Sequence, residues 1–256
     1  MPLKAIVKSK IAKTLCHPRV GKLLALLFRD RIPSRGCVVA TDSPVITPEI
    51  KAMLFWRFYE SAEIRFVDRY IRRDLDVVEL GSSLGVVACQ IRKRINESSK
   101  LLCVEANPGL AGLISRNLKV NSLDKKVSII GKAIDYDPTK RGAVNFHCGD
   151  SNISGKVAEQ QRAGDSSRVP TTTLAQLMNE NGINDYVLVS DIEGAEAGIA
   201  LADKEALKTC RQIIIELHDT VFDNKRVDVE QMCKAFIKLH GFTLRDRYGP
   251  VCVFEK

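Results

Sequence analysis

Short apolar runs alternate with segments of helical periodicity through most of the chain. The runs are typical of buried strands and lie at 76–80, 101–105, 127–134, 186–190 and 212–217. Apolar residues that recur every three or four positions predict helices at 85–96, 108–121, 173–182 and 228–240. The segments 242–247 and 251–255 flank a Tyr-Gly-Pro turn and predict a closing hairpin. Strands that alternate with helices indicate a doubly wound, mostly parallel α/β sheet.

The chain before residue 47 has a different pattern. The elements predicted there are two basic helices and a connector, at 3–15, 20–29 and 32–47. Thr47 followed by Pro48 starts a helix that runs to Phe58, and Ser61 begins a second helix that covers the sheet. The two predicted units are a basic helical extension, 1–46, and the main domain, 47–256.

The net charge of +8 is concentrated in this extension. Residues 1–36 hold nine Lys or Arg and one acid, Asp30, whereas the rest of the chain has equal numbers of bases and acids. A neutral main domain argues against a nucleic-acid channel, so nucleic acid is not an expected partner. Two hypotheses stand for the basic, amphipathic segment. Its apolar face packs on the domain, or it makes peripheral contact with an anionic membrane.

Eight cysteines occur without a Cys-x-x-Cys motif, and Cys89 and Cys103 lie in apolar runs. This pattern indicates reduced, buried thiols. The longest apolar run near the start, 23–28, is far shorter than the ~20 residues that span a bilayer. We therefore expect a cytoplasmic protein that reaches a membrane, if at all, only from its surface.

The strand at 76–80 leads into a glycine turn of the pattern Glu-x-Gly-x-x-x-Gly. The candidate cofactor-binding residues of this turn are Glu79, Gly81, Ser82 and Gly85. Strand, glycine turn and helix present backbone N–H groups to a nucleotide-like ligand. Gly81 allows close backbone approach, and Gly85 allows the helix to pack tightly on the strand. Ser83 replaces the middle glycine of the dinucleotide motif, which disfavours NAD or FAD and favours a nucleoside such as S-adenosylmethionine. The alternative is a turn that serves packing alone.

Two more strand ends supply candidate cofactor contacts. Glu105 lies 20 residues after Gly85, near the ~20-residue offset at which an acid takes the ribose hydroxyls. Its alternative role is a solvated carboxylate. Ala133 and Ile134 end the third strand, where we expect them beside the adenine. After this strand, the polar segment 149–155 is interpreted as a loop, either over the site or simply on the surface.

Several segments of the chain occur in a characteristic order. They are Val77 to Gly85, Val104 to Pro108 with Asn117, Thr173-Leu174, Ser190 to Glu196, and Ile215 to His218. Over about residues 75–220 they resemble the FkbM family of S-adenosylmethionine-dependent methyltransferases. The segment Asp-Ile-Glu-Gly-Ala-Glu is the most diagnostic. The family usually has Lys where Ser190 stands and Asp where Glu79 stands.

This resemblance implies a class I methyltransferase fold, with a seven-stranded sheet and an antiparallel strand added by the terminal hairpin. It implies S-adenosylmethionine as the cofactor. It also implies a small-molecule or glycan acceptor, with the methyl group placed on a hydroxyl of a sugar, glycan or secondary metabolite.

A hydroxyl acceptor loses its proton as it attacks the methyl group, so the site needs a base. Asp191 and His218 follow the strands at 186–190 and 212–217, and we predict them as catalytic residues. His218 has the better intrinsic pKa for a base, although a structural histidine at a strand end is the alternative. Asp191 with Glu193 and Glu216 is a set that a divalent cation can bind, but this is the less favoured hypothesis and no metal site is predicted.

Two other functions stand beside the O-methyltransferase hypothesis. The departures at Ser190 and Glu79 are also compatible with a catalytically silent binding or scaffold protein that keeps the fold. The pI of about 9.1 also suggests the hypothesis of an RNA methyltransferase, but the neutral charge of the main domain disfavours it.

Overall fold

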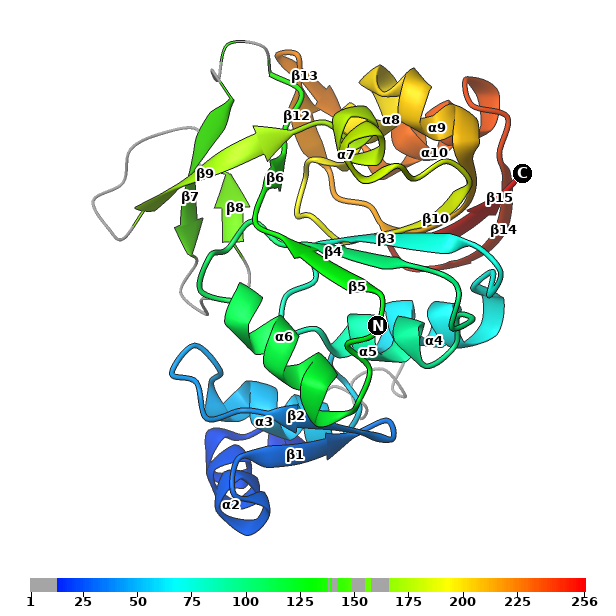
Figure 1. Cartoon of the computed structure of the whole chain (residues 1–256). Helices are drawn as coiled ribbons and strands as arrows, with labels where there is room; N and C mark the ends of the chain where they lie inside the picture. Colours follow the sequence, from blue (N-terminus) through cyan, green and yellow to red (C-terminus); the bar gives the residue numbers. More distant parts are fainter. Residues whose placement is uncertain (1–12, 138, 140–141, 149–154, 158–165) are drawn as a thin grey trace, which may run out of the picture.

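The computed structural model describes residues 13–137, 139, 142–148, 155–157 and 166–256. The strands of its main sheet are β3 (Asp76–Leu80), β4 (Leu101–Val104), β5 (Val127–Ile130), β10 (Tyr186–Ser190), β11 (Cys210–Glu216), β14 (Thr243–Tyr248) and β15 (Val251–Glu255). Their order is β14-β15-β11-β10-β3-β4-β5 (Figure 1). The five strands from β5 to β11 are parallel, and β15 is antiparallel to both neighbours. The predicted doubly wound, seven-stranded sheet with a C-terminal hairpin is therefore confirmed.

Helices cover both faces of this sheet (Figure 1). One face carries α4 (Ser61–Tyr70), α5 (Val86–Arg92) and α6 (Ala111–Val120). The other carries α7 (Leu174–Asn181), α8 (Glu196–Ala202), α9 (Lys204–Thr209) and α10 (Val229–Lys238). Successive side chains of a strand point to opposite faces, so Val187 of β10 joins the first core and Leu188 the second. This double burial is why the strands are short, continuous apolar runs in the sequence.

The N-terminal part packs against α6 (Figure 1). It consists of α2 (Pro18–Phe28), β1 (Arg31–Ser34), β2 (Cys37–Ala40) and α3 (Pro48–Phe55). Asn117 on α6 holds the β1–β2 hairpin, because its side-chain oxygen accepts a hydrogen bond from the Ala40 N–H at 2.8 Å. Ile32 and Val39 of the hairpin are buried in the same core as Val77 of β3. The extension thus shares the core of the main domain, and the boundary at residue 46 stays a prediction.

Smaller sheets lie beside the main one. A four-stranded sheet has the strands β6 (Ala133–Ile134), β9 (Ser166–Thr172), β7 (Ala143–Cys148) and β8 (Gly155–Val157), in that order. A two-stranded ribbon has the strands β12 (Thr220–Phe222) and β13 (Lys225–Val227). In Figure 1 the four-stranded sheet projects from the edge of the main sheet next to β5 and β4. Neither β7, β9 nor the ribbon is among the strands predicted from the sequence.

Several predicted elements are wrong in their extent. The strand predicted at 127–134 is split, because Ala133 and Ile134 pair with Thr171 and Thr172 of β9 instead of continuing β5. The connector predicted at 32–47 contains most of the β1–β2 hairpin, in which buried side chains alternate along β1. The first error arises because the partner strand β9 is remote in the sequence. The second arises because β1 and β2 have only four residues each, too few for a clear alternating pattern.

Three helices are shorter than predicted, and the one expected at 85–96 spans only Val86–Arg92. The helix expected at 108–121 begins at Ala111, because the Asn107 side chain accepts a hydrogen bond from Gly109 N–H at 2.9 Å and forms a turn before the helix. The helix that starts at Thr47 and Pro48 ends at Phe55 instead of Phe58. Its predicted start is confirmed, since the Thr47 hydroxyl accepts from the Ile50 N–H.

Two predictions fall largely outside the described residues. These are the basic helix at 3–15, of which only residues 13–15 are described, and the loop at 149–155, of which only Gly155 is described. Within the described ranges, no helix combines the length and apolar character needed to cross a membrane.

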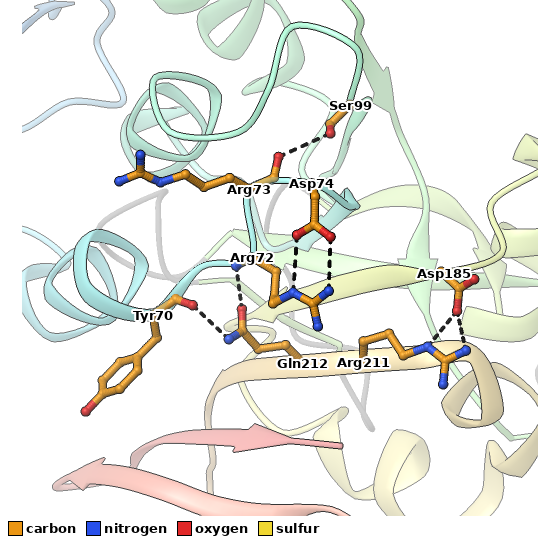
Figure 2. A network of polar contacts seen from close by, with 8 residues as sticks. All are labelled: Tyr70, Arg72, Arg73, Asp74, Ser99, Asp185, Arg211 and Gln212. Carbon is orange, nitrogen blue, oxygen red and sulfur yellow. Dashed lines mark hydrogen bonds and ion pairs between the residues drawn. The ribbon is translucent and has the colours of Figure 1, made fainter.

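A buried amide joins α4 to the edge of the sheet where the parallel strands begin (Figure 2). Gln212 of β11 is fully buried, and its side-chain N–H groups donate to the Tyr70 carbonyl and to Glu255, both at 2.8 Å. Its side-chain oxygen accepts from Arg72 N–H at 3.0 Å. This contact holds α4 at the end of the sheet opposite to the strand ends that carry the candidate site residues.

Candidate functional site

The turn after β3 brings the ends of β3 and β10 together. Gly81 has φ +82°, and a Cβ at this position would lie 1.8 Å from the carbonyl oxygen of Asp191. The Asp191 N–H donates to the Leu80 carbonyl at 3.0 Å, so the two chains are joined at this point. Only glycine fits such an approach. The close backbone approach predicted for Gly81 therefore exists, and it is made to the end of β10.

Gly85 has a different role from the predicted one. Its φ is +75°, and a Cβ would lie 3.2 Å from the Cα of Ile114 on α6. The tight packing at Gly85 is therefore against α6, and the prediction that it serves packing on the strand is corrected. Asn117, also on α6, donates its side-chain N–H to the Leu84 carbonyl at 2.8 Å. Helix α6 thus determines the shape of the glycine turn.

Glu79 and Ser82 form a buried pair under the turn. The Ser82 hydroxyl donates to Oε2 of Glu79 at 2.7 Å. Burial raises the pKa of Glu79 to about 7, with the Ser82 hydrogen bond acting in the opposite direction. A carboxyl with this pKa is present in both protonation states near neutral pH. Both residues support the turn, and their contact with a cofactor stays a prediction.

Glu105 connects the end of β4 to the glycine turn. Its Oε2 accepts from Ser83 N–H and its Oε1 accepts from Asn107 N–H, both at 2.8 Å. Burial raises the pKa of Glu105, and these backbone hydrogen bonds oppose that shift. The Glu105 side chain is therefore fixed by backbone hydrogen bonds and is not a solvated carboxylate. Each carboxylate oxygen has a second lone pair that can accept a hydrogen bond from a ribose hydroxyl, so the predicted contact with the ribose stays a prediction.

Ala133 and Ile134 lie in β6, after the end of β5, and both are buried. Ala133 packs with Val144 and Val169 of the four-stranded sheet, whereas Ile134 joins the core below α7 and α10. Their predicted place beside an adenine stays untested, and their strand is not the one that the sequence analysis assigned.

The ends of β10 and β11 bring Asp191 and His218 together. His218 Nε2 lies 3.9 Å from Oδ1 of Asp191 and 3.7 Å from Oε1 of Glu216. His218 Nδ1 lies 3.0 Å from Oε1 of Glu196, the first residue of α8. One imidazole thus faces three carboxylates.

The protonation states within this cluster differ from those of free side chains. The hydrogen bond to Glu196 raises the pKa of His218 to about 9, against the effect of burial. Burial, followed by the charge of Glu216, raises the pKa of Asp191 to about 7. At neutral pH His218 is an imidazolium ion, and Asp191 is the group whose pKa suits proton transfer.

Glu196 is the positioning residue of the cluster, and the sequence analysis gave it no such role. It is fully buried, and it also accepts from Ile192 N–H at 3.2 Å and Gly194 N–H at 2.8 Å. These bonds fold the 191–196 turn back on itself and bring the carboxylate to His218. Both bonds satisfy backbone N–H groups just before α8.

Two further carboxylates at the start of α4 were missed altogether. Glu63 is 4% exposed, and Glu60 is the N-cap of α4 with φ +45° and no capping hydrogen bond from its side chain. Burial raises the pKa of both groups, and their charged neighbours include Asp191 and Glu79. Next to them, the Tyr59 hydroxyl hydrogen-bonds the Ser83 hydroxyl at 2.9 Å. The beginning of α4 therefore lies over the glycine turn.

A signal for Glu63 does exist in the sequence. Glu63, Phe66, Val67 and Tyr70 share one helical face, at spacings of three, four and seven. A carboxylate on an apolar face is unusual, because burying a charge is costly unless a partner compensates it. Glu63 has no hydrogen-bond partner among the described residues.

The cluster also contains the geometry of a cation site. Single ligand atoms of Asp191, Glu196 and His218 lie within 4.8 Å of one another. This set differs from the disfavoured set of Asp191, Glu193 and Glu216. Both oxygens of Glu196 already accept hydrogen bonds and His218 Nδ1 is engaged by Glu196, so the observed contacts favour an internal ion pair over metal ligation.

Comparison with known protein families gives one extended match. The model of the Methyltransferase FkbM domain matches residues 83–244, more than half of the chain. This range contains Glu105, Asp191, Glu196 and His218 and begins within the glycine turn. No curated protein sequence matches the chain.

Solved structures with a similar arrangement include several methyltransferases. An O-methyltransferase from Bacillus cereus in complex with SAH has a TM-score of 0.43 and 13% identity, over 76% of this chain and 78% of that one. A precorrin-6y C5,15-methyltransferase from Geobacter metallireducens GS-15 has a TM-score of 0.42 and 12% identity, over 85% of this chain and 95% of that one. The M. jannaschii tRNA m1G37 methyltransferase has a TM-score of 0.42 and 14% identity, over 87% of this chain and 55% of that one.

Proposed function

The chain belongs to the FkbM methyltransferase family, and on this basis we propose that it moves the methyl group of S-adenosylmethionine to a hydroxyl of a sugar, glycan or secondary metabolite. When bound, the cofactor supplies an electrophilic methyl group on a positively charged sulfur. The protein then has to position the cofactor and the acceptor and to take up one proton.

One observation carries the cofactor part of the proposal, namely an excess of buried and half-buried carboxyl groups around the strand ends. Burial is the main cause of a raised pKa at six of them, which are Glu60, Glu63, Glu79, Glu105, Asp191 and Glu216. Among these carboxyls lies one imidazole, since His218 Nε2 is 3.9 Å from Asp191 and 3.7 Å from Glu216, and its charge lowers the pKa of both. A site that withdraws several carboxyls from water is suited to a ligand that brings positive charge.

S-adenosylmethionine fits this requirement, because it carries a sulfonium and an ammonium group. Glu105 beside the glycine turn is placed for the ribose hydroxyls. Glu63, buried and without a hydrogen-bond partner in the described ranges, has a free carboxyl for one of the cations. The residues present therefore fit the cofactor, with Glu60 and Glu63 added to the contacts inferred from the sequence.

Asp191 is the proposed base. Its pKa of about 7 allows it to accept a proton from a hydroxyl acceptor near neutral pH. Its Oδ1 is buried and has no hydrogen-bond partner among the described residues, so it is available to a substrate group. His218 is protonated at this pH and serves to balance the charge of Asp191, Glu196 and Glu216.

The acceptor class rests on the family resemblance. The alternative is a catalytically silent scaffold, because Ser190 and Glu79 depart from the family pattern. A direct test has to distinguish the two. A binding measurement shows whether the protein still binds the cofactor. A methyl-transfer assay then shows whether a protein that binds it is an enzyme or a catalytically silent scaffold.

The experiment is calorimetric titration of the full chain with S-adenosylmethionine and S-adenosylhomocysteine, followed by transfer of a labelled methyl group to a panel of sugars and polyols. Glu105→Ala is the test variant, and Glu97→Ala, an exposed acid outside the site, is its control. We expect saturable binding that only Glu105→Ala weakens. No binding at millimolar cofactor would overturn the proposal. Binding without transfer to any acceptor, including RNA, would favour the scaffold.

A further inference from the structure

Helix α2 exposes a row of leucines at the surface of the N-terminal part. The sequence left open whether the apolar face of this segment packs on the domain or contacts a membrane. Leu23, Leu26 and Leu27 are 55%, 76% and 65% exposed. They lie at spacings of three and four and therefore form one face, which we call the leucine face of α2. Isolated surface leucines are ordinary, but three adjacent ones on one helix form an apolar patch that calls for an explanation.

The packed side of α2 is the opposite one. A Cβ at Gly21 would lie 1.7 Å from the Pro48 carbonyl oxygen, so α2 crosses the start of α3 at very short range. Leu24 is buried, and the rings of Phe28 and Phe55 lie 5.5 Å apart. Helix α2 therefore packs on α3 through Gly21, Leu24 and Phe28, and the exposed fractions place the leucine face on the opposite, solvent side. In Figure 1, α2 lies at the bottom of the molecule, below α3 and β1.

Basic side chains surround the leucine face. Arg19 and Lys22 lie one turn before Leu23 and Leu26, on the same side of the helix, and both are exposed. Arg29 and Arg31 follow the helix and are also exposed. Asp30, the acid that directly follows α2, is already paired with Lys51 at 2.6 Å. The patch thus has an apolar centre and a cationic border without a free acid.

We propose that the leucine face of α2 docks on an anionic lipid membrane, with the leucines in the interface and the flanking Arg and Lys side chains on the acidic headgroups. An apolar stripe with a basic border is the arrangement by which a helix lies in the plane of a membrane interface. Each basic residue near an anionic surface contributes to binding, and the contribution is screened by salt.

Charge favours this partner over two others. A second copy of the chain would bring the Arg19, Lys22 and Arg29 side chains of both copies together, with no acid on the patch to neutralise them. A nucleic acid would use the cations but would leave the leucines without an apolar partner, since its backbone presents phosphates. An anionic bilayer satisfies both parts of the patch.

The test is flotation of the full chain with phosphatidylcholine vesicles that contain or lack phosphatidylserine. Leu26→Gln with Leu27→Gln removes the apolar part, and Leu239→Gln with Leu244→Gln is the control at exposed leucines outside α2. Arg19→Gln with Lys22→Gln removes two charges, and Lys225→Gln with Arg226→Gln is the matched control. We expect binding only to the anionic vesicles, reduced about fivefold for each lost charge and weakened by salt. The leucine pair should reduce it about tenfold or more, and neither control should reduce it.

Several outcomes would overturn the proposal. No binding to anionic vesicles, or equal binding by the wild type and the leucine variant, would exclude a membrane. A dimer in light scattering that only the leucine variant disrupts would identify a second copy as the partner. A clear loss of thermal stability in the leucine variant would show that the chain itself covers this face. An unchanged far-UV circular dichroism spectrum of each variant verifies that it remains folded.

Discussion

The imidazole Nδ1 of His218 lies 3.0 Å from Oε1 of the buried Glu196, and this contact determines how the cluster at the ends of β10 and β11 is protonated. Glu196 is held by backbone N–H groups, so it does not move away from the ring. The ion pair keeps His218 protonated at neutral pH and leaves the role of base to Asp191. Sequence reasoning, guided by the intrinsic pKa of histidine, favoured His218 for that role.

The first prediction concerns stability and pH. Since the folded-state pKa of His218, about 9, is above its unfolded value of 6.5, its stabilising effect is complete below pH 6.5 and is lost as pH rises through 9. The linkage amounts to about 3 kcal/mol of unfolding free energy. We expect wild type to lose stability between pH 7 and 9 relative to His218→Gln in urea unfolding. Parallel curves for the two proteins would contradict the ion pair.

The second prediction concerns Asp191 as the base. Asp191→Asn removes the proton acceptor but keeps the shape of the side chain, so methyl transfer should fall by about 10²- to 10⁴-fold. Cofactor affinity should change little. In wild type, the rate should rise with pH up to about 7, as Asp191 loses its proton, and this rise should be absent in the variant. A variant with full activity and the same pH profile would exclude Asp191.

The third prediction concerns Glu63. Burial raises its pKa, and a cation bound next to it would favour the charged form, so binding of S-adenosylmethionine should release a proton. Calorimetry in buffers of different ionisation enthalpy measures this release. Glu63→Gln should abolish the release from this group and weaken binding about tenfold, whereas Glu97→Gln should do neither. Equal proton release by wild type and Glu63→Gln would contradict the contact.

The fourth prediction concerns the network in Figure 2. Gln212→Ala removes a fully buried amide and leaves the part-buried Arg72 N–H and Tyr70 carbonyl without their partner, which should lower the free energy of unfolding by about 2 kcal/mol. The neighbouring Arg211 pairs with Asp185 at the surface. Arg211→Ala should therefore cost at most about 1 kcal/mol. Urea denaturation compares the two, and equal losses would show that burial of Gln212 is not the cause.

The fifth prediction concerns metal ions. Because Glu196 and His218 satisfy each other, we expect Mg²⁺ or Mn²⁺ not to raise the melting temperature of the cofactor-free protein, and EDTA not to change cofactor affinity. Differential scanning fluorimetry over a range of cation concentrations checks the first point. A rise that saturates, and that Asp191→Asn removes, would instead establish a cation site at Asp191, Glu196 and His218.

Much of the fold was predictable because its central strands are buried on both faces. Double burial makes β3, β4, β10 and β11 continuous apolar runs, and parallel pairing then requires their carboxyl ends to meet at one edge. For this reason the convergence of Gly81, Glu105, Asp191 and His218 was foreseeable, although the contacts of each were not. The strands β6 and β9 were misassigned or missed, since they pair with each other although they are remote in the sequence. The hairpin β1–β2 was missed because each of its strands has only four residues, too few for a clear alternating pattern.

The sequence by itself determined the α/β class, the strand ends that carry the polar residues, and the accumulation of positive charge before residue 37. The tertiary structure decided the state and the surroundings of those residues. In the folded chain Glu63 is a buried carboxyl over the glycine turn, and His218 is paired with Glu196. Gly21 and Leu24 of α2 face the protein, so the leucine face of this helix is exposed. The physical reason is that periodicity records whether a position is apolar, whereas a pKa or an exposed face depends on which distant groups come to lie beside it.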